Sequence, residues 1–161
     1  SITHVSCERL THNNTLEILV KDGNSWSLSN KEMTPVAGAV VNLYKTQADV
    51  IAGNPPDYTG TTNNSGLVRI TVKIQGEAYY LIAEKEGARN VHNGLVIYKM
   101  FESLDEVNAS ALQTPAAAIG TPMYHDINAD GLINSSDAEY GLPLGSNRTD
   151  ETKITVIIYK Y

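Results

Sequence analysis

The chain has 161 residues, a net charge of −6, 42% hydrophobic residues and 19% charged residues, the composition of an ordinary folded domain rather than a disordered or fibrous one. The acidic balance disfavours nucleic-acid binding, because phosphate backbones require a basic face. No run of 18 apolar residues could form a membrane-spanning helix, and the single cysteine, Cys7, excludes an internal disulfide.

Residues 1–14 are expected to form a polar tether in front of one domain, 15–161. Because the chain starts with Ser1, we expect that an upstream segment has been removed. Cys7 followed by the polar stretch ERLTHNN resembles the lipidated cysteine of a bacterial lipoprotein. However, His4 lies where such a signal usually has leucine, and no apolar signal core is visible. The two readings of Cys7 are therefore a lipid anchor and a free thiol.

Alternating or β-branched apolar patterns predict a series of short strands. In chain order they are 15–22, 37–46, 67–74, 78–86, 94–99 and 153–161. The clearest is LVRITVKI (67–74), in which apolar and polar side chains alternate strictly. Loops rich in Gly, Asn and Pro separate the strands. This pattern predicts an all-β fold, an antiparallel β-sandwich in a single domain.

One segment breaks the strand pattern. FESLDEVNASALQ (101–113) places Phe101, Leu104, Val107 and Ala111 on one helical face, with Ser103 and Glu106 at capping-box spacing. This predicts a short helix at the start of an insertion, about 100–150, that precedes the closing strand. An unstructured insertion of that length is uncommon in a compact domain, so something should order it.

The segment DINADGLINSSD (126–137) has the spacing of a twelve-residue calcium loop. Side-chain oxygens fall at positions 1, 3 and 5, glycine at the sharp turn of position 6, a backbone carbonyl at position 7 and a carboxylate at position 12. The predicted metal ligands are Asp126, Asn128, Asp130, Leu132 through its carbonyl, and Asp137, with a water possible at Asn134. Hard oxygen ligands without cysteine favour Ca²⁺ over zinc, copper or the more strictly octahedral Mg²⁺. The alternative is an Asx-rich turn without metal.

This loop resembles those of dockerins and EF-hand-like loops that end in Asp. A dockerin carries two loop–helix copies, whereas one loop is present here, and Gly141 and Pro143 make the following segment a poor helix. Cohesin docking and calcium sensing are therefore not supported. The expected role of the ion is structural, namely to neutralise the carboxylates and hold the insertion in place.

The first ninety residues carry a second resemblance. The segments PVAGAVVNLYKT, TGTTNNSGLVRITV and GEAYYLIAEKEG are similar to a prealbumin-like sandwich of the carboxypeptidase regulatory-like and Cna-B types. Such domains occur in bacterial surface proteins, and those with a late acidic loop resemble Bacteroidetes-type envelope lipoproteins. The resemblance implies a location at the bacterial cell envelope, on the outer-membrane surface or in the periplasm.

No catalytic motif is evident, and the four histidines lack metal or triad spacing, so we expect no enzyme activity. The leading hypothesis is a non-catalytic calcium-binding envelope module whose partner is another surface protein or a matrix component. The alternative is a glycan-binding protein of a polysaccharide-uptake system, with Trp26, Tyr58 and Tyr140 as a ligand platform; a small hydrolase is a weaker possibility. Trp26 could instead simply cap the core.

Overall fold

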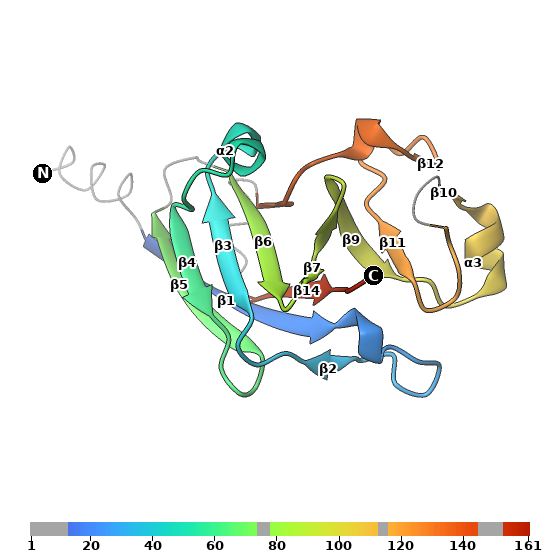
Figure 1. Ribbon diagram of the computed structural model, residues 1–161, viewed down its shortest axis with the longest axis horizontal. Coiled ribbons are helices and arrows are strands. Elements are labelled where there is room, and N and C mark those ends of the chain that lie inside the picture. The colour runs from blue at the N-terminus through green and yellow to red at the C-terminus, as the bar shows by residue number, and fades with distance from the viewer. Residues whose placement is uncertain (1–12, 74–77, 113–115, 145–152) are drawn as a thin grey trace, which may run out of the picture.

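The computed structural model describes residues 13–73, 78–112, 116–144 and 153–161. These residues form a mostly β-structure (Figure 1) that includes two short α-helices. Residues 1–12 of the predicted tether, Cys7 among them, lie outside the described residues, whereas residues 13 and 14 belong to the first strand and not to a tether. Several sheets, largely antiparallel, form a β-sandwich with an additional lobe beside it. No helix within the described ranges is long and apolar enough to cross a membrane.

The first sheet is built around β1 (Asn13–Asp22), the longest strand. On one side β1 pairs antiparallel with β5 (Leu67–Lys73) and, further along, with β2 (Thr34–Pro35). On the other side it pairs in parallel with the closing strand β14 (Lys153–Ile158). A parallel pair cannot be closed by a hairpin, and here the chain returns only after it has built the rest of the fold.

The second sheet has the order β13-β6-β3-β4, with all pairs antiparallel. Its strands are β13 (Leu142–Leu144), β6 (Tyr79–Lys85), β3 (Val40–Tyr44) and β4 (Tyr58–Thr61), and β7 (Ala88–Arg89) pairs with β6. Helix α2 (Gln47–Ala52) connects β3 to β4. Strand β13 was not predicted, and it returns the end of the insertion to the sandwich.

The main core lies between these two sheets. It is formed by the side chains that point inward at every second residue of each strand. The largest fully buried members include Leu16, Ile18, Val20, Val41, Leu43, Val72, Tyr79, Leu81, Leu144 and Ile158. The predicted strand pattern is confirmed, because Ile70 and Val72 of β5 are buried while Arg69, Thr71 and Lys73 are exposed.

Residues 91–112 and 116–133 form a satellite lobe, which contains the first part of the predicted insertion (about 100–150) together with the strands that precede it. Strands β8 (Val91–His92), β9 (Leu95–Met100) and β11 (Pro122–Tyr124) pair in the order β11-β9-β8. Two short strands, β10 (Ala111–Leu112) and β12 (Leu132–Ile133), pair in parallel. The lobe lies beside the sandwich in Figure 1 and has a small core of its own, containing Leu95, Ile97, Tyr124 and Ile133.

The predicted helix over 101–113 is wrong in extent, because α3 covers only Leu104–Ala109. Its expected apolar face is not buried: Leu104 is 65% exposed, whereas Phe101 is fully buried but precedes the helix. The expected cap is present, since Ser103 Oγ accepts a hydrogen bond from the Glu106 backbone amide at 3.1 Å. The Glu106 carboxylate accepts instead from the Glu102 amide and from Lys99, which leaves the capping box incomplete.

Thr62 lies in the turn between β4 and β5 and bonds this turn to the segment that precedes β3. Its buried hydroxyl accepts from the Ala39 amide at 2.9 Å and donates to the Val36 carbonyl at 2.6 Å. In the turn that follows, Gly66 has φ +77°, and an added Cβ would collide with Pro35; glycine adopts this conformation without strain.

We expect Thr62→Val, which keeps the shape of the side chain, to lower the free energy of unfolding by about 2 kcal/mol, because a buried amide and a carbonyl lose their partner. Urea denaturation followed by Trp26 fluorescence measures this change. The control is Thr59→Val, which removes an exposed hydroxyl bonded to Asn42 and should cost less than about 1 kcal/mol. Equal losses in the two variants would contradict the role assigned to Thr62.

Candidate functional site

The acidic loop, which we define as residues 126–137, follows β11 and contains β12 and a 3₁₀ turn at Ser135–Asp137. Two of its residues have positive φ: Ala129 (+56°) and Gly131 (+79°). Gly131 tolerates this conformation without strain and is the residue that the calcium-loop pattern requires there. The backbone therefore turns sharply at the predicted place.

The predicted ligand side chains are held by a ladder of hydrogen bonds to the loop's own backbone. Asp126 Oδ2 accepts from the Gly131 amide at 2.8 Å, Asn128 Oδ1 from the Asp130 amide at 3.3 Å, and Asp130 Oδ1 from the Leu132 amide at 2.9 Å. The bonds of Asn128 and Asp130 are Asx turns, which Asn and Asp form readily, whereas the bond of Asp126 reaches across the loop to a residue five positions on. Each bond fixes one oxygen of a predicted ligand with respect to the backbone.

Asp137 joins the two ends of the loop. Its side chain is fully buried, Oδ1 accepts from the Ile127 amide at 2.9 Å, and Oδ2 accepts from the Asn134 amide at 3.1 Å. Asn134 in turn caps the 3₁₀ turn by accepting from the Ser136 amide. The last predicted ligand is therefore the residue that closes the loop.

Asp126 has one oxygen without a partner. Its Oδ1 is buried and accepts no hydrogen bond, which is costly for a carboxylate. None of the described ion pairs includes Asp126, Asp130 or Asp137. In the described part of the chain, no three Asp, Glu, His or Cys side chains converge into a metal cluster by themselves, so any ion held here would also depend on amide and carbonyl oxygens.

A groove that the sequence did not predict lies directly against this loop, with a volume of about 580 Å³. One wall comes from the acidic loop, one from the end of α3 and one from β9 and β11. The lining residues are Tyr98, Glu106, Ala109, Ser110, Met123, Tyr124, His125, Asp126, Ile127, Gly131 and Ile133. No signal in the sequence joined these segments, because they meet only through the pairing of β9 with β11 and of β10 with β12.

His125 and Tyr98 both line the groove. His125 Nδ1 lies 3.3 Å from Glu139 Oε1, and the Tyr98 ring lies 5.5 Å from the imidazole, centroid to centroid. Tyr98 is 61% exposed. The other described histidine, His92, contacts Asn93 and stacks on Tyr124, and burial lowers its pKa. Both histidines therefore pair with groups other than a serine or cysteine nucleophile.

Glu106, which lines the groove, forms a salt bridge with Lys99. Lys99 Nζ donates to Glu106 Oε1 at 2.8 Å. This hydrogen bond lowers the pKa of the Glu106 carboxyl and raises the pKa of the Lys99 amine. Both groups thus stay charged near neutral pH, and the positive charge of Lys99 is committed to Glu106.

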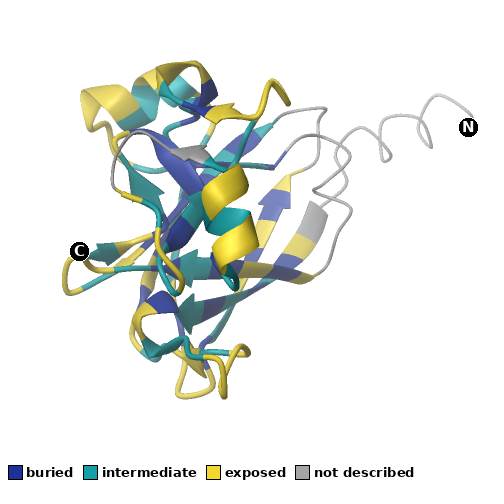
Figure 2. Cartoon of the chain, turned by 90° about the vertical axis from the view of Figure 1, so that its right-hand side faces the viewer, coloured by how far each residue is buried: buried dark blue, intermediate teal, exposed yellow. Residues whose placement is uncertain are grey.

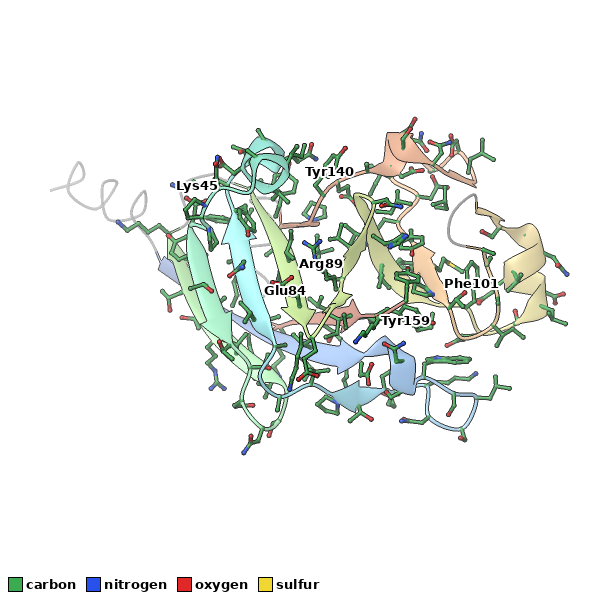
Figure 3. All side chains as sticks on the ribbon, in the orientation of Figure 1. Lys45, Glu84, Arg89, Phe101, Tyr140 and Tyr159 are labelled. Atoms are coloured by element: carbon green, nitrogen blue, oxygen red, sulfur yellow. The ribbon has the colours of Figure 1, made fainter. Side chains whose placement is uncertain are left out.

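The three aromatic residues of the predicted ligand platform are placed separately. The Trp26 ring packs near Gly120, Tyr58 makes an edge contact with Tyr79 of the core, and the Tyr140 ring lies against Gly94. Figure 3 shows Tyr140 at the junction between the sandwich and the lobe. None of the described ring pairs joins one member of the trio to another. A glycan platform formed by these residues stays a prediction.

No protein-family model matches the chain, and no curated protein matches it. Among solved structures, the shaft pilin SpaA from Lactobacillus rhamnosus GG aligns with a TM-score of 0.38 and 10% identity, covering 92% of this chain and 52% of the pilin. The N-terminal domain of that pilin gives 0.32 and 11%, covering 91% and 94%. The chain therefore spans about half the length of the longer pilin structure.

An enzyme aligns equally well. The 3-chlorocatechol 1,2-dioxygenase from Rhodococcus opacus 1CP gives a TM-score of 0.37 and 12% identity, covering 94% of this chain and 62% of the enzyme. Because the pilin and the dioxygenase align with similar TM-scores, these distant structural similarities do not indicate a function for this chain.

Proposed function

We propose that the protein is a non-catalytic module of the bacterial cell envelope in which a calcium ion, bound by the acidic loop, holds the satellite lobe in its folded arrangement. The β-sandwich agrees with the prealbumin-like resemblance of its first ninety residues, which points to a surface protein. Its partner would be another surface protein.

The buried, unpartnered Asp126 Oδ1 is the single observation that carries the calcium proposal. A carboxylate oxygen that has no hydrogen-bond donor and no basic side chain is stabilised by a cation. It belongs to the first position of the loop pattern, and the other positions are filled by oxygen-bearing residues. The residues present therefore fit a hard divalent cation.

The donor set comprises side-chain oxygens of Asp126, Asn128, Asp130 and Asp137 and the carbonyl of Leu132, with a water at Asn134. The backbone hydrogen bonds of the loop do not exhaust these groups, because an ionised carboxylate offers about four lone-pair sites. Three carboxylates in one short loop repel one another. A bound Ca²⁺ would remove that repulsion, supply two positive charges and hold the loop between β11 and β13.

The expected stabilisation is substantial. A site of about 10 µM affinity in about 1 mM calcium would stabilise the folded state by about 2.7 kcal/mol. That is a large share of the ~5–15 kcal/mol that separates most folded domains from the unfolded state.

We therefore expect the melting temperature to rise by about 5–10 °C between 1 mM EGTA and 1 mM CaCl₂. Asp126→Ala should abolish that rise, because it removes the first ligand. The matched control is Glu32→Ala, which removes an exposed acid from a distant loop and should retain the full rise. Coincident melting curves for the unmodified protein in the two buffers would refute the calcium proposal.

A further inference from the structure

Both ends of the acidic loop are held by one hairpin, formed by β8 and β9. The residue before the loop, His125, donates its backbone amide to the Val96 carbonyl at 2.9 Å. Beyond the loop, Glu139 and Tyr140 donate their backbone amides to the Gly94 carbonyl at 2.8 and 3.0 Å. Gly94 lies in the turn of the hairpin and Val96 in β9. The hairpin therefore fixes the positions at which the chain enters and leaves the loop.

The turn of this hairpin fits closely against the segment that leaves the loop. Gly94 is buried and has φ +83°, and a Cβ added to it would lie 3.0 Å from the Ala138 Cβ and 3.0 Å from the Tyr140 ring. Any other residue at this position would strain the backbone and displace the segment. In Figure 2, which views the molecule from the lobe side, exposed residues of α3 face the viewer, whereas residues 94–97 of the hairpin are buried. Gly94 thus makes its contacts away from solvent.

Side-chain contacts join the entrance of the loop to its exit. His125 Nδ1 lies 3.3 Å from Glu139 Oε1, and Glu139 is 7% exposed. Within the loop, the Asp137 carboxylate accepts from the Ile127 and Asn134 amides. The two ends of the loop are therefore connected to each other as well as to the hairpin.

This arrangement differs from the usual support of a twelve-residue calcium loop, which is a helix on each side. Here the strand β11 precedes the loop, and residues 138–141 after it are not helical. A site whose ligands are already held in position loses less conformational freedom when it binds an ion. In this fold, the backbone bonds to Gly94 and Val96 provide the support that flanking helices would otherwise give.

We propose that the β8–β9 hairpin positions the calcium site, and that Gly94, which supplies no ligand, is a positioning residue that raises the affinity for the ion. The inference rests on the calcium site proposed above and specifies what organises it. Because such coupling is reciprocal, a bound ion also holds the hairpin against the exit of the loop. Strand β9 pairs with β11, so the effect of the ion extends to the lobe strands on both sides of the hairpin turn.

Gly94→Ala tests this inference, with Gly53→Ala as the matched control. Gly53 also has a positive φ, +71°, but no atom outside its own chain neighbours lies within 4 Å of a Cβ added there. Isothermal titration calorimetry, on protein shown by circular dichroism to be folded, should give a calcium affinity about tenfold weaker in Gly94→Ala and unchanged in Gly53→Ala. For a site of about 10 µM affinity, that loss reduces the rise in melting temperature in 1 mM calcium by about half.

Tyr140→Ala is a second variant, which carries the test if Gly94→Ala does not fold. It removes the ring that lies against Gly94 but keeps both backbone bonds, so the calcium affinity should weaken about threefold to fivefold. A substitution that only weakened the fold would lower the melting temperature equally in EGTA and in calcium, with the calcium affinity of the folded protein unchanged. Unchanged affinity in folded Gly94→Ala, or in Tyr140→Ala if Gly94→Ala is unfolded, would overturn the inference, as would an equal loss in Gly53→Ala.

The positioning role and the calcium proposal fail in different ways. If the unmodified protein gives no heat of calcium binding and coincident melting curves in CaCl₂ and EGTA, the calcium proposal itself is refuted. If the unmodified protein binds calcium and folded Gly94→Ala binds it equally well, only the role of the hairpin is refuted, and the calcium site remains.

Discussion

Asp137→Ala is expected to lower the free energy of unfolding by about 4–5 kcal/mol in 1 mM calcium, and by about 2 kcal/mol in EGTA. The smaller value reflects the Ile127 and Asn134 amides, which lose the carboxylate that accepts from both. The remainder is the stabilisation expected from the proposed calcium ion, which the variant would no longer hold. Urea denaturation in each buffer, monitored by Trp26 fluorescence and by far-UV circular dichroism, measures both values.

Asp130→Ala is the matched control within the loop. Asp130 is exposed, and its carboxylate accepts from only one amide, that of Leu132. In EGTA this variant should lose less than about 1 kcal/mol, yet in calcium it should lose most of the stabilisation by the ion. If Asp137→Ala and Asp130→Ala were equally stable in EGTA, Asp137 would not be the residue that closes the loop.

Asn90→Ala is expected to lower the free energy of unfolding by about 3 kcal/mol, whether or not calcium is present. The Asn90 side chain is 1% exposed, accepts from the Ala83 amide at 2.9 Å, and donates to the Leu81 carbonyl at 3.1 Å. Its backbone also bonds to Ala83 and to Ile97. One side chain thus links β6 of the sandwich to the strands that begin the lobe.

The size of this loss follows from burial rather than from the number of bonds. Removing the amide leaves a buried donor and a buried acceptor without partners, and each costs about 1–3 kcal/mol. Asn54→Ala, which removes an exposed amide bonded to Asp49, should cost less than about 0.5 kcal/mol. Equilibrium denaturation of the two variants separates these cases, and a loss below about 1 kcal/mol for Asn90→Ala would contradict the linking role.

Local patterns were sufficient to predict the longer strands of the sandwich, β1, β3, β5, β6 and β14, but not the shorter strands β2, β4, β7 and β13. Alternation over 67–74 identified β5 and its buried face, and β-branched residues identified β3, because a half-buried strand requires these patterns whatever its partners. The parallel pairing of β1 with β14 could not be predicted in this way. It depends on which strand meets which, and no periodicity within either segment contains that information.

The insertion was harder to predict for a related reason. Phe101 and Leu104 suggested one apolar helical face, but tertiary packing buries Phe101 in the lobe and leaves Leu104 exposed. Gly131 was correctly assigned to the sharp turn. The need for a residue that adopts positive φ arises within the loop itself and can therefore be read from the local sequence. Asn90 and the groove around Tyr98 were missed, because their roles arise from contacts between segments that are distant in the chain.

The pairing of the first strand with the last also determines how the fold would respond to tension. Residues 17–22 of β1 lie in parallel register with residues 153–158 of β14. If the beginning of β1 and the end of β14 are pulled in opposite directions, the force runs along the strands and across their bonds. The evenly spaced bonds of a parallel pair then share the load in shear instead of opening one after another, a geometry suited to mechanical resistance.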